Sequence, residues 1–319
     1  MKTAIKTPIT FANQADVLLE HLRTRKRDPV KGSTLSVYGS YVHTWIVPSL
    51  GGQSLASFGT PEMRLFISLL AKSLKPKSVN EIVSLTKQII ASVVDETSEQ
   101  PMFPRTWDSH RIDLPRVVQR DQRTPTVTRE DIERAIRDSI EPYSVLFACL
   151  AGTGLRINEV LSVRLDDAAT TDTGTHSVFD VASATIHVRT GLWRRREQSS
   201  PKTAAAIRSV ELYSELAAML AAFSLHRTGF LFSNDGVQPL SESTARLRLT
   251  TLGLPGFHSF RRYRTTWLRK QRAPEDLIRA WLGHSDGSIT DHYSKLSSDD
   301  LCRRSECERI GLGFNLPEE

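Results

Sequence analysis

The sequence predicts a mainly α-helical protein with one small β-sheet, divided into a helical domain and a mixed α/β domain. Apolar residues recur at helical spacing through much of residues 11–96, as in Ile82, Leu85 and Ile89. Within residues 178–212, apolar and polar residues alternate as they do in strands, and helical patterns lie on both sides. The 319 residues are enough for two domains that each bury a core of their own.

The helical domain is predicted to cover residues 8–104, with turns at Gly51 and Pro76. Residues 105–125 are predicted to be an interdomain linker. The stretch from Gln100 to Pro125 carries four prolines and many charges, and it shows no sustained periodicity. The domain boundary is therefore expected there.

The mixed α/β domain is predicted to cover residues 126–300. Thr128 is expected to cap a helix over residues 129–140, with Asp131 at the capping-box position. A second helix is expected over residues 143–152, and the alternating segments 186–189 and 207–212 are expected to be strands.

Residues 301–319 form a C-terminal tail. A short helix is expected over residues 298–309, and its continuation carries the apolar Leu312, Phe314 and Leu316. Two interpretations of these apolar residues are open. Either they dock on a neighbouring protomer, or they belong to a frayed and solvated terminus.

The composition favours a soluble protein with a polyanionic partner. The formal charge is +6 and the pI is near 9.3. Residues 1–13 lack the apolar stretch of a signal peptide, and no apolar run approaches the length of a membrane span. The cysteines, Cys149, Cys302 and Cys307, have no histidine near them at a metal-finger spacing. We therefore expect a reduced, cytoplasmic protein with no metal, no cofactor and no membrane partner.

Six residues far apart in the chain carry the most specific signal. They are Arg156, Lys202, His258, Arg261, His284 and Tyr293. Their settings are TGLRINEVLSV, SPKTAAAIRSVEL, HSFRRYRTTWL and WLGHSDGSITDHYSK. One helical turn separates His258 from Arg261, so both side chains can point at the same ligand. Gly283, before His284, is suited to a helix-ending turn with positive φ.

At these settings the chain closely resembles the tyrosine recombinases, the phage-integrase family. The resemblance covers nearly the whole chain, because residues 33–58 are similar to the helical, SAM-like core-binding domain of integrases. It implies an enzyme of the simple two-domain type represented by Xer and Cre, without an arm-binding domain. Such an enzyme is a site-specific DNA recombinase or integrase that cleaves and rejoins strands through a 3′-phosphotyrosyl intermediate, without metal or ATP.

The resemblance also implies roles for the six residues. Tyr293 is the implied nucleophile, and a phenol pKa of about 10 suits it to reversible attack on phosphorus. Arg156 and Arg261 are implied to bind the phosphate oxygens, for which a planar guanidinium is well shaped. His258 and His284 are implied to contact the same phosphate.

The remaining assignments concern supporting groups. Lys202 is implied to be the general acid that protonates the leaving 5′-oxygen. Glu159 lies one turn after Arg156 and is expected to orient it. Arg194, Arg195 and Arg262 are expected to bind DNA, and Arg264 is expected to face solvent.

The implied partner is double-stranded DNA carrying core recombination sites, bound by a homotetramer that assembles on two duplexes. A type IB topoisomerase uses the same chemistry and is an alternative, although the spacing from His284 to Tyr293 favours a recombinase. A catalytically idle, architectural DNA-binding protein is a third hypothesis. The presence of all six residues argues against it.

Overall fold

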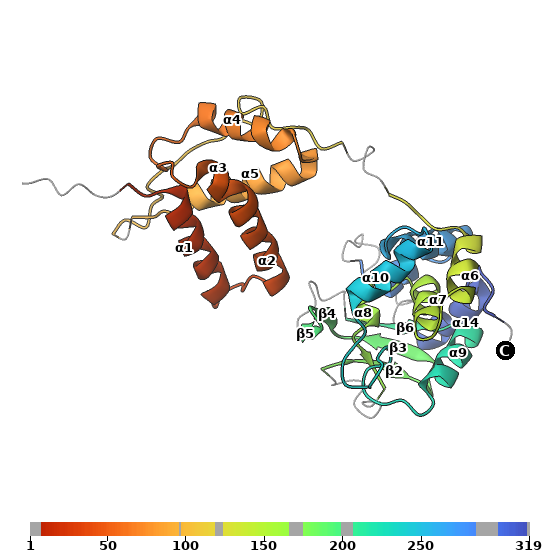
Figure 1. Ribbon diagram of the computed structural model, residues 1–319. Coiled ribbons are helices and arrows are strands. Elements are labelled where there is room, and N and C mark those ends of the chain that lie inside the picture. The colour runs from red at the N-terminus through yellow and green to blue at the C-terminus, as the bar shows by residue number, and fades with distance from the viewer. Residues whose placement is uncertain are drawn as a thin grey trace, which may run out of the picture. The chain divides into compact units, whose positions relative to one another are not determined.

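The computed structural model describes residues 8–95, 97–118, 124–165, 175–198, 207–284 and 299–317. The chain forms two compact units, residues 1–122 and 123–319 (Figure 1). The first unit is helical, and the second combines helices with a four-stranded sheet and a separate two-stranded hairpin. The predicted class, mainly α with a small sheet, is confirmed.

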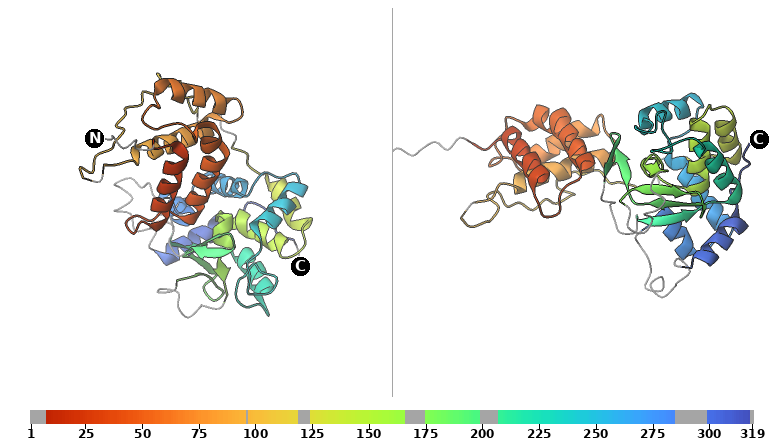
Figure 2. Two further views of the ribbon diagram at one scale, coloured as in Figure 1. Left: turned by 60° about the vertical axis from the view of Figure 1, so that its left-hand side comes forward. Right: turned by 90° about the horizontal axis from the view of Figure 1, so that it is seen from below.

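The helices of the N-terminal unit lie against one another (Figure 2) and bury an apolar core between them. The helices are α1 (Phe11–Thr24), α2 (Gly32–Tyr41), the π turn η1 (Val42–Ile46), α3 (Val47–Leu50), α4 (Thr60–Ala71) and α5 (Pro76–Ala91). Phe11 and Phe58 meet edge to face in this core, with ring centroids 4.8 Å apart. The π turn joins α2 to α3 just before Pro48, which has no N–H to continue a regular α-helical ladder.

Much of the predicted linker packs on the N-terminal unit. Ile112 is fully buried in its core, and the ring of Trp107 lies 6.3 Å from that of Phe58. Arg105 donates from Nη2 to the carbonyl oxygen of Leu55 at 3.1 Å. This packing corrects the prediction of a linker over residues 105–125 as far as residue 114. Prolines and charges suppress a helical period, but scattered apolar side chains can still pack as irregular chain.

The second unit contains the elements α6 (Arg129–Arg137), α7 (Tyr143–Thr153), α8 (Ile157–Val160), β1 (Val163–Arg164), β2 (Ser177–Asp180), β3 (Thr185–Val188), β4 (Gly191–Trp193), β5 (Arg196–Gln198), β6 (Arg208–Glu211), α9 (Ser214–Ser224), α10 (Glu242–Thr251), α11 (His258–Lys270), α12 (Glu275–Leu282) and α14 (Asp300–Ile310). The sheet order is β1-β2-β3-β6, in which β1 and β2 are parallel and the other pairs are antiparallel. Strands β4 and β5 form the antiparallel hairpin.

Local signals place several of these elements as expected. Thr128 caps α6: its Oγ1 accepts the N–H of Asp131 at 3.1 Å, and a carboxylate oxygen of Asp131 accepts the N–H of Thr128 at 3.1 Å. The helix ends at Arg137 rather than at Ile140. The residue before Pro142 is disfavoured in helical conformation, so the chain leaves the helix early.

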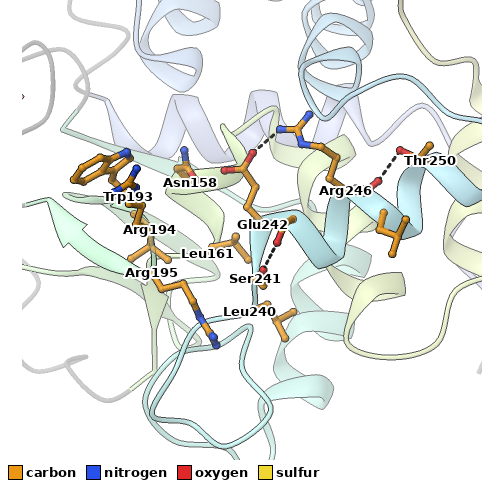
Figure 3. A pocket seen from close by; sticks show the side chains of 13 residues that line it. Asn158, Leu161, Trp193, Arg194, Arg195, Leu240, Ser241, Glu242, Arg246 and Thr250 are labelled. Atoms are coloured by element: carbon orange, nitrogen blue, oxygen red, sulfur yellow. Dashed lines mark hydrogen bonds and ion pairs between the residues drawn. The ribbon is translucent and has the colours of Figure 1, made fainter. Parts of the chain in front are cut away.

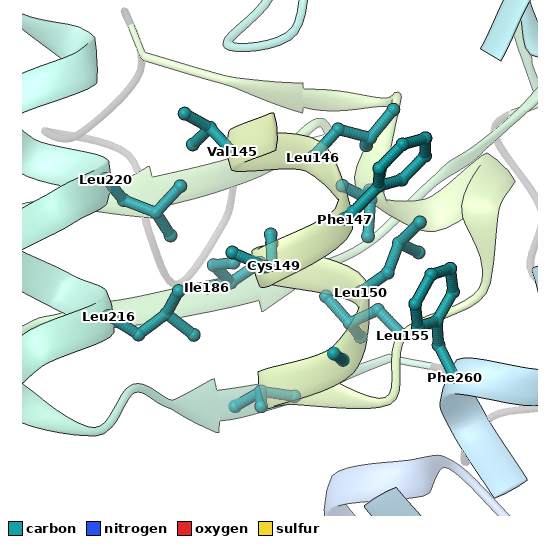
Figure 4. Close-up of a cluster of buried hydrophobic side chains, with 14 of the residues drawn as sticks. Val145, Leu146, Phe147, Cys149, Leu150, Leu155, Ile186, Leu216, Leu220 and Phe260 are labelled. Carbon is teal, nitrogen blue, oxygen red and sulfur yellow. The ribbon is translucent and has the colours of Figure 1, made fainter. Parts of the chain in front are cut away.

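Helix α7 is the centre of the second core. Its residues from Ser144 to Thr153 are all buried, and it packs against α6, α9 and α11. Figure 4 shows Leu216 and Leu220 of α9 on one side of α7 and Phe260 of α11 on the other. The rings of Phe147 and Phe260 stack with centroids 5.9 Å apart. A helix held on so many sides gives a fixed starting point for the segment that follows it.

The C-terminal tail packs on its own unit. Leu312 and Phe314 are 3% and 5% exposed, within the apolar core. Trp267 donates from Nε1 to the carbonyl oxygen of Ile310 at 3.0 Å. Gly313 has φ of 83°, and a Cβ there would lie 2.5 Å from the Trp267 ring. The interpretation of a frayed terminus is thus wrong for these residues, and docking of the tail on a neighbouring protomer stays a prediction. Over the residues that the structure describes, no helix has the length and apolarity to cross a membrane.

Candidate active site

Arg261 joins three segments that are far apart in the sequence. It lies on the first turn of α11 and is 4% exposed. Its Nη1 donates to the carbonyl oxygen of Gly154 at 2.9 Å, and its Nη2 donates to the carbonyl oxygen of Leu282. The same Nη2 lies 3.0 Å from Nε2 of His284. The guanidinium therefore holds the end of α7, the start of α11 and the end of α12 around one point.

The two helices that end beside the Arg261 guanidinium, α7 and α12, both terminate at a glycine. Gly154 ends α7 with φ of 70°, and a Cβ there would lie 2.9 Å from Leu282. Gly283 ends α12 with φ of 67°, as the sequence predicts. Side chains larger than hydrogen are disfavoured at such φ values. The two turns bring Arg156 and His284 to the same place.

Arg156 lies at the N-cap of the short helix α8 and is positioned by Glu159. The backbone N–H of Arg156 donates to Glu159 Oε2 at 2.9 Å, and its Nη1 donates to Glu159 Oε1 at 2.8 Å. The Arg156 side chain is 45% exposed, whereas that of Glu159 is 10% exposed. The buried carboxylate thus fixes a guanidinium that remains accessible to a ligand.

Sequence reasoning missed a further buried arginine, Arg208 of β6. Its side chain is 5% exposed, and its Nη2 lies 2.8 Å from Oε2 of Glu159. Its Nε donates to the carbonyl oxygen of Trp281 at 2.8 Å. Strand parity offered a signal, because Arg208 shares a face with the buried Val210. Glu159 therefore bridges two arginines, one accessible and one buried.

The concentration of positive charge shifts the site's pKa values. Burial, together with the positive charge of the nearby Arg156, lowers the pKa of Arg261 to about 10. Burial is also the main cause that lowers the pKa of His258 and of His284, followed by the neighbouring arginines, Arg261 and Arg156 among them. Both histidines are thus biased toward the neutral form in the absence of an anion.

Glu159 has the opposite electrostatic setting. Burial alone would raise its pKa, but hydrogen bonds and charges from Arg208 and Arg156 hold that pKa below its usual value. The carboxylate is therefore ionised near neutral pH, and its role fits orientation of the arginines rather than proton transfer.

The structure brings together four of the six predicted residues: Arg156, His258, Arg261 and His284. The interactions of both histidines with Arg156 and Arg261 place all four in one electrostatic cluster. Lys202 and Tyr293 lie outside the described residues.

The two arginines predicted to bind DNA from the hairpin lie at its tip. Arg194 and Arg195 both have positive φ, 51° and 64°, as a two-residue hairpin turn requires. Arg194 lies over the ring of Trp193, 4.9 Å from its centroid, and Arg195 donates to the carbonyl oxygen of Pro239 at 2.8 Å.

Beside this tip, a groove of about 640 Å³ runs between the hairpin and the first turns of α10. Figure 3 shows Trp193, Arg194 and Arg195 on one side and the ion-paired Glu242 and Arg246 on the other.

On α11, Arg262 and Arg264 have different surroundings. Arg262 donates from Nη1 to the carbonyl oxygen of Pro125 at 2.8 Å and is partly exposed. Arg264 is 5% exposed and donates to the carbonyl oxygen of Gly311 at 2.6 Å. The expectation that Arg264 faces solvent is therefore wrong. Position 264 lies on the inner face of α11, where it fastens the C-terminal tail.

The described residues contain no group of three or more His, Cys, Asp and Glu side chains that could hold a metal ion. The buried carboxylates nearest the site, Glu159 and Glu211, are instead paired with arginines.

The fold matches DNA-bound integrases of known structure. A Tn1549 transposon integrase in complex with transposon right end DNA matches with a TM-score of 0.65 and 16% identity, over 91% of this chain and 99% of that chain. A lambda integrase dimer bound to a COC′ core site matches with a TM-score of 0.62 and 17% identity, over 92% of this chain and 79% of that one.

A lambda integrase tetramer bound to a Holliday junction has a TM-score of 0.65 and 16% identity, over 90% of this chain and 84% of that chain. No match was found among the curated protein sequences. The structural likenesses define the fold class as that of the integrases.

Residues 126–299 match the phage integrase family, over more than half of the chain. The chain belongs to this family. It is accordingly an enzyme of site-specific DNA recombination, as the sequence resemblance implies.

Proposed function

We propose that this recombinase cleaves and rejoins DNA through a 3′-phosphotyrosyl intermediate, with Tyr293 as the nucleophile. The observation that carries the proposal is the position of Arg261. Its contacts with Gly154, Leu282 and His284 gather cationic groups from three segments around one point. Such a cluster matches the needs of phosphoryl transfer, in which charge on the non-bridging oxygens must be stabilised.

Each of the four site residues that the structure describes has a proposed role at the phosphate. The non-bridging oxygens are bound by Arg156, which is accessible, and by Arg261, which is buried and held by two backbone carbonyls. His258 and His284 donate hydrogen bonds to the same oxygens. An approaching phosphodiester favours their charged forms, which the neighbouring arginines oppose when the site is empty.

The two remaining roles belong to Tyr293 and Lys202. The Tyr293 hydroxyl loses its proton to water and its oxygen forms a bond to phosphorus as the bond to the 5′-oxygen breaks, while Lys202 supplies the proton that the leaving oxygen needs. The phosphotyrosyl bond keeps the energy of the broken phosphodiester, so a free 5′-hydroxyl reverses the reaction without ATP.

The proposed partner is double-stranded DNA with core recombination sites. Arg194, Arg195 and Arg262 are proposed backbone contacts, since a guanidinium that donates to a protein carbonyl still has further N–H groups for phosphate. We also propose that four protomers assemble on two duplexes in the cytoplasm. The match to a lambda integrase tetramer on a Holliday junction supports this assembly.

A nicked suicide half-site tests the proposal, because loss of the short product traps the covalent complex. The wild-type protein should form this complex in EDTA, and Tyr293→Phe should bind the DNA with similar affinity but form none. Arg156→Ala should slow complex formation by about a hundredfold, as loss of an electrostatic stabiliser commonly does. DNA binding by the wild-type protein without any covalent complex would favour an architectural protein. Relaxation of supercoils without recombination would favour the topoisomerase.

A further inference from the structure

Helix α14 is fastened to β6 by a buried ion pair. Arg303 Nη2 lies 2.7 Å from Oε1 of Glu211, and the two side chains are 10% and 4% exposed. Arg303 Nε donates to Oε2 of the same carboxylate at 3.2 Å, and its Nη2 also donates to the carbonyl oxygen of Ser209 at 2.6 Å. The planar guanidinium therefore fixes both the position and the rotation of α14 against the strand.

Glu211 also binds Trp281, which is close to the active site in sequence and in space. Trp281 donates from Nε1 to Glu211 Oε2 at 2.7 Å. Its carbonyl oxygen accepts from Arg208 Nε, and Arg208 binds Glu159. Since Glu159 in turn binds Arg156, an unbroken series of hydrogen bonds runs from α14 to the accessible guanidinium.

Trp281 is the point at which this series meets the other half of the site. The residue that follows it, Leu282, supplies the carbonyl oxygen that Arg261 holds, and His284 lies two residues further. A displacement of Trp281 would move Arg208, Glu159 and Arg156 on one side, and the turn carrying His284 on the other. The backbone carbonyls of Trp281 and Leu282 thus join both sets of cations, and the Trp281 indole is held by Glu211.

We propose that Glu211 and Arg303 are positioning residues for strand transfer, which hold α14 against β6 and thereby align Trp281 and Arg156. This inference rests on the proposed function and deepens it, because it assigns a role in catalysis to a helix that itself contributes no group to the phosphate. The chemistry of the phosphate site depends on fine alignment. A misplacement of about 1 Å can slow a reaction by about a hundredfold.

The next residue along the helix provides a matched control. Arg304 also fastens α14, since it donates from Nη2 to the carbonyl oxygen of Ser183 at 2.6 Å. Its hydrogen bonds go to Ser183 and Thr185, outside the series that leads to Arg156. Comparison of Arg303→Met with Arg304→Met therefore separates alignment of the site from attachment of the helix.

The experiment measures covalent-complex formation on the nicked half-site at saturating full-length protein, alongside DNA affinity. Arg303→Met should slow the reaction by about a hundredfold with little change in affinity, and Arg304→Met should stay within about twofold of wild type. Arg303→Lys, which keeps the charge but not the fork, should recover part of the rate. Trp281→Phe keeps the ring and both charges. It should also slow the reaction, and it provides the test of the proposal if Arg303→Met fails to fold.

Two results would overturn the positioning role while leaving the proposed function intact. One is a wild-type rate for both Arg303→Met and Trp281→Phe. The other is an equal loss of rate in Arg303→Met and Arg304→Met, which would mean that attachment of the helix alone matters. Absence of a covalent complex from the wild-type protein itself would reject the proposed function and this inference together.

Discussion

Replacement of Arg208 by methionine should substantially destabilise the second unit, residues 123–319. The change removes one partner of a pair whose side chains are 5% and 10% exposed, and Glu159 then keeps its charge in a buried place. Breaking a buried pair from one side costs about 3–5 kcal/mol, and the lower figure applies here because Arg156 remains a partner of Glu159.

A loss of about 3 kcal/mol corresponds to a fall in melting temperature of about 6–12 °C for a unit of this size. Thermal unfolding followed by circular dichroism at pH 7 measures it. Arg129→Met is the control, because Arg129 pairs with Glu133 at the surface, with side chains 50% and 27% exposed. That change should cost less than about 1 kcal/mol.

The pH dependence of stability provides a second test of the buried pair between Arg208 and Glu159. In the wild-type protein the pKa of Glu159 is held below its usual value, so its contribution to stability is present near neutral pH and is lost only in acid. In Arg208→Met, burial should raise the pKa of Glu159. The difference in free energy of unfolding between wild type and variant should therefore shrink as the pH falls from 7 to 5. A small, pH-independent effect, no larger than that of Arg129→Met, would refute the buried-pair reasoning.

Phe314→Ala should destabilise the second unit by about 3 kcal/mol in thermal unfolding, whereas Leu301→Ala, at a residue 83% exposed, should have almost no effect. Similar small losses of stability for both variants would contradict the packing of the tail on its own unit. DNA binding near pH 6 should take up protons, because the pKa values of His258 and His284 are lowered in the free protein and a bound phosphate raises them. Calorimetry in buffers of different ionisation enthalpy measures the proton uptake, and heats of binding that do not depend on the buffer would contradict it. Lys202→Ala should be rescued by a 5′-bridging sulfur, which leaves without a proton, whereas Arg156→Ala should not; the reverse pattern would exchange their roles.

Features set by neighbouring residues could be predicted from the sequence. The cap at Thr128, the helix that starts after Arg156 and the turn at Gly283 depend on side chains within a few positions of one another. The pairing of Glu159 with Arg156 belongs to the same group, because one helical turn brings the two together.

Features set by distant residues could not be predicted. Arg208 and Glu159 are 49 positions apart, and Arg303 and Glu211 are 92 apart. Each is charged, and charged side chains are normally assigned to the surface unless a buried partner is known. The packing of the tail could not be predicted for a similar reason, because Tyr263, Arg264 and Trp267 of α11, about 45 positions earlier, hold it in place.

Identification of the residue joined to DNA tests directly whether Tyr293 is the nucleophile. The trapped half-site complex is digested with protease and nuclease, and the modified peptide is sequenced by mass spectrometry. With trypsin, which cuts after Arg279 and Lys295, we expect one modified peptide, spanning residues 280–295, with a 3′-phosphonucleotide on the oxygen of Tyr293. Attachment at any other residue, or through a 5′-phosphate, would contradict it.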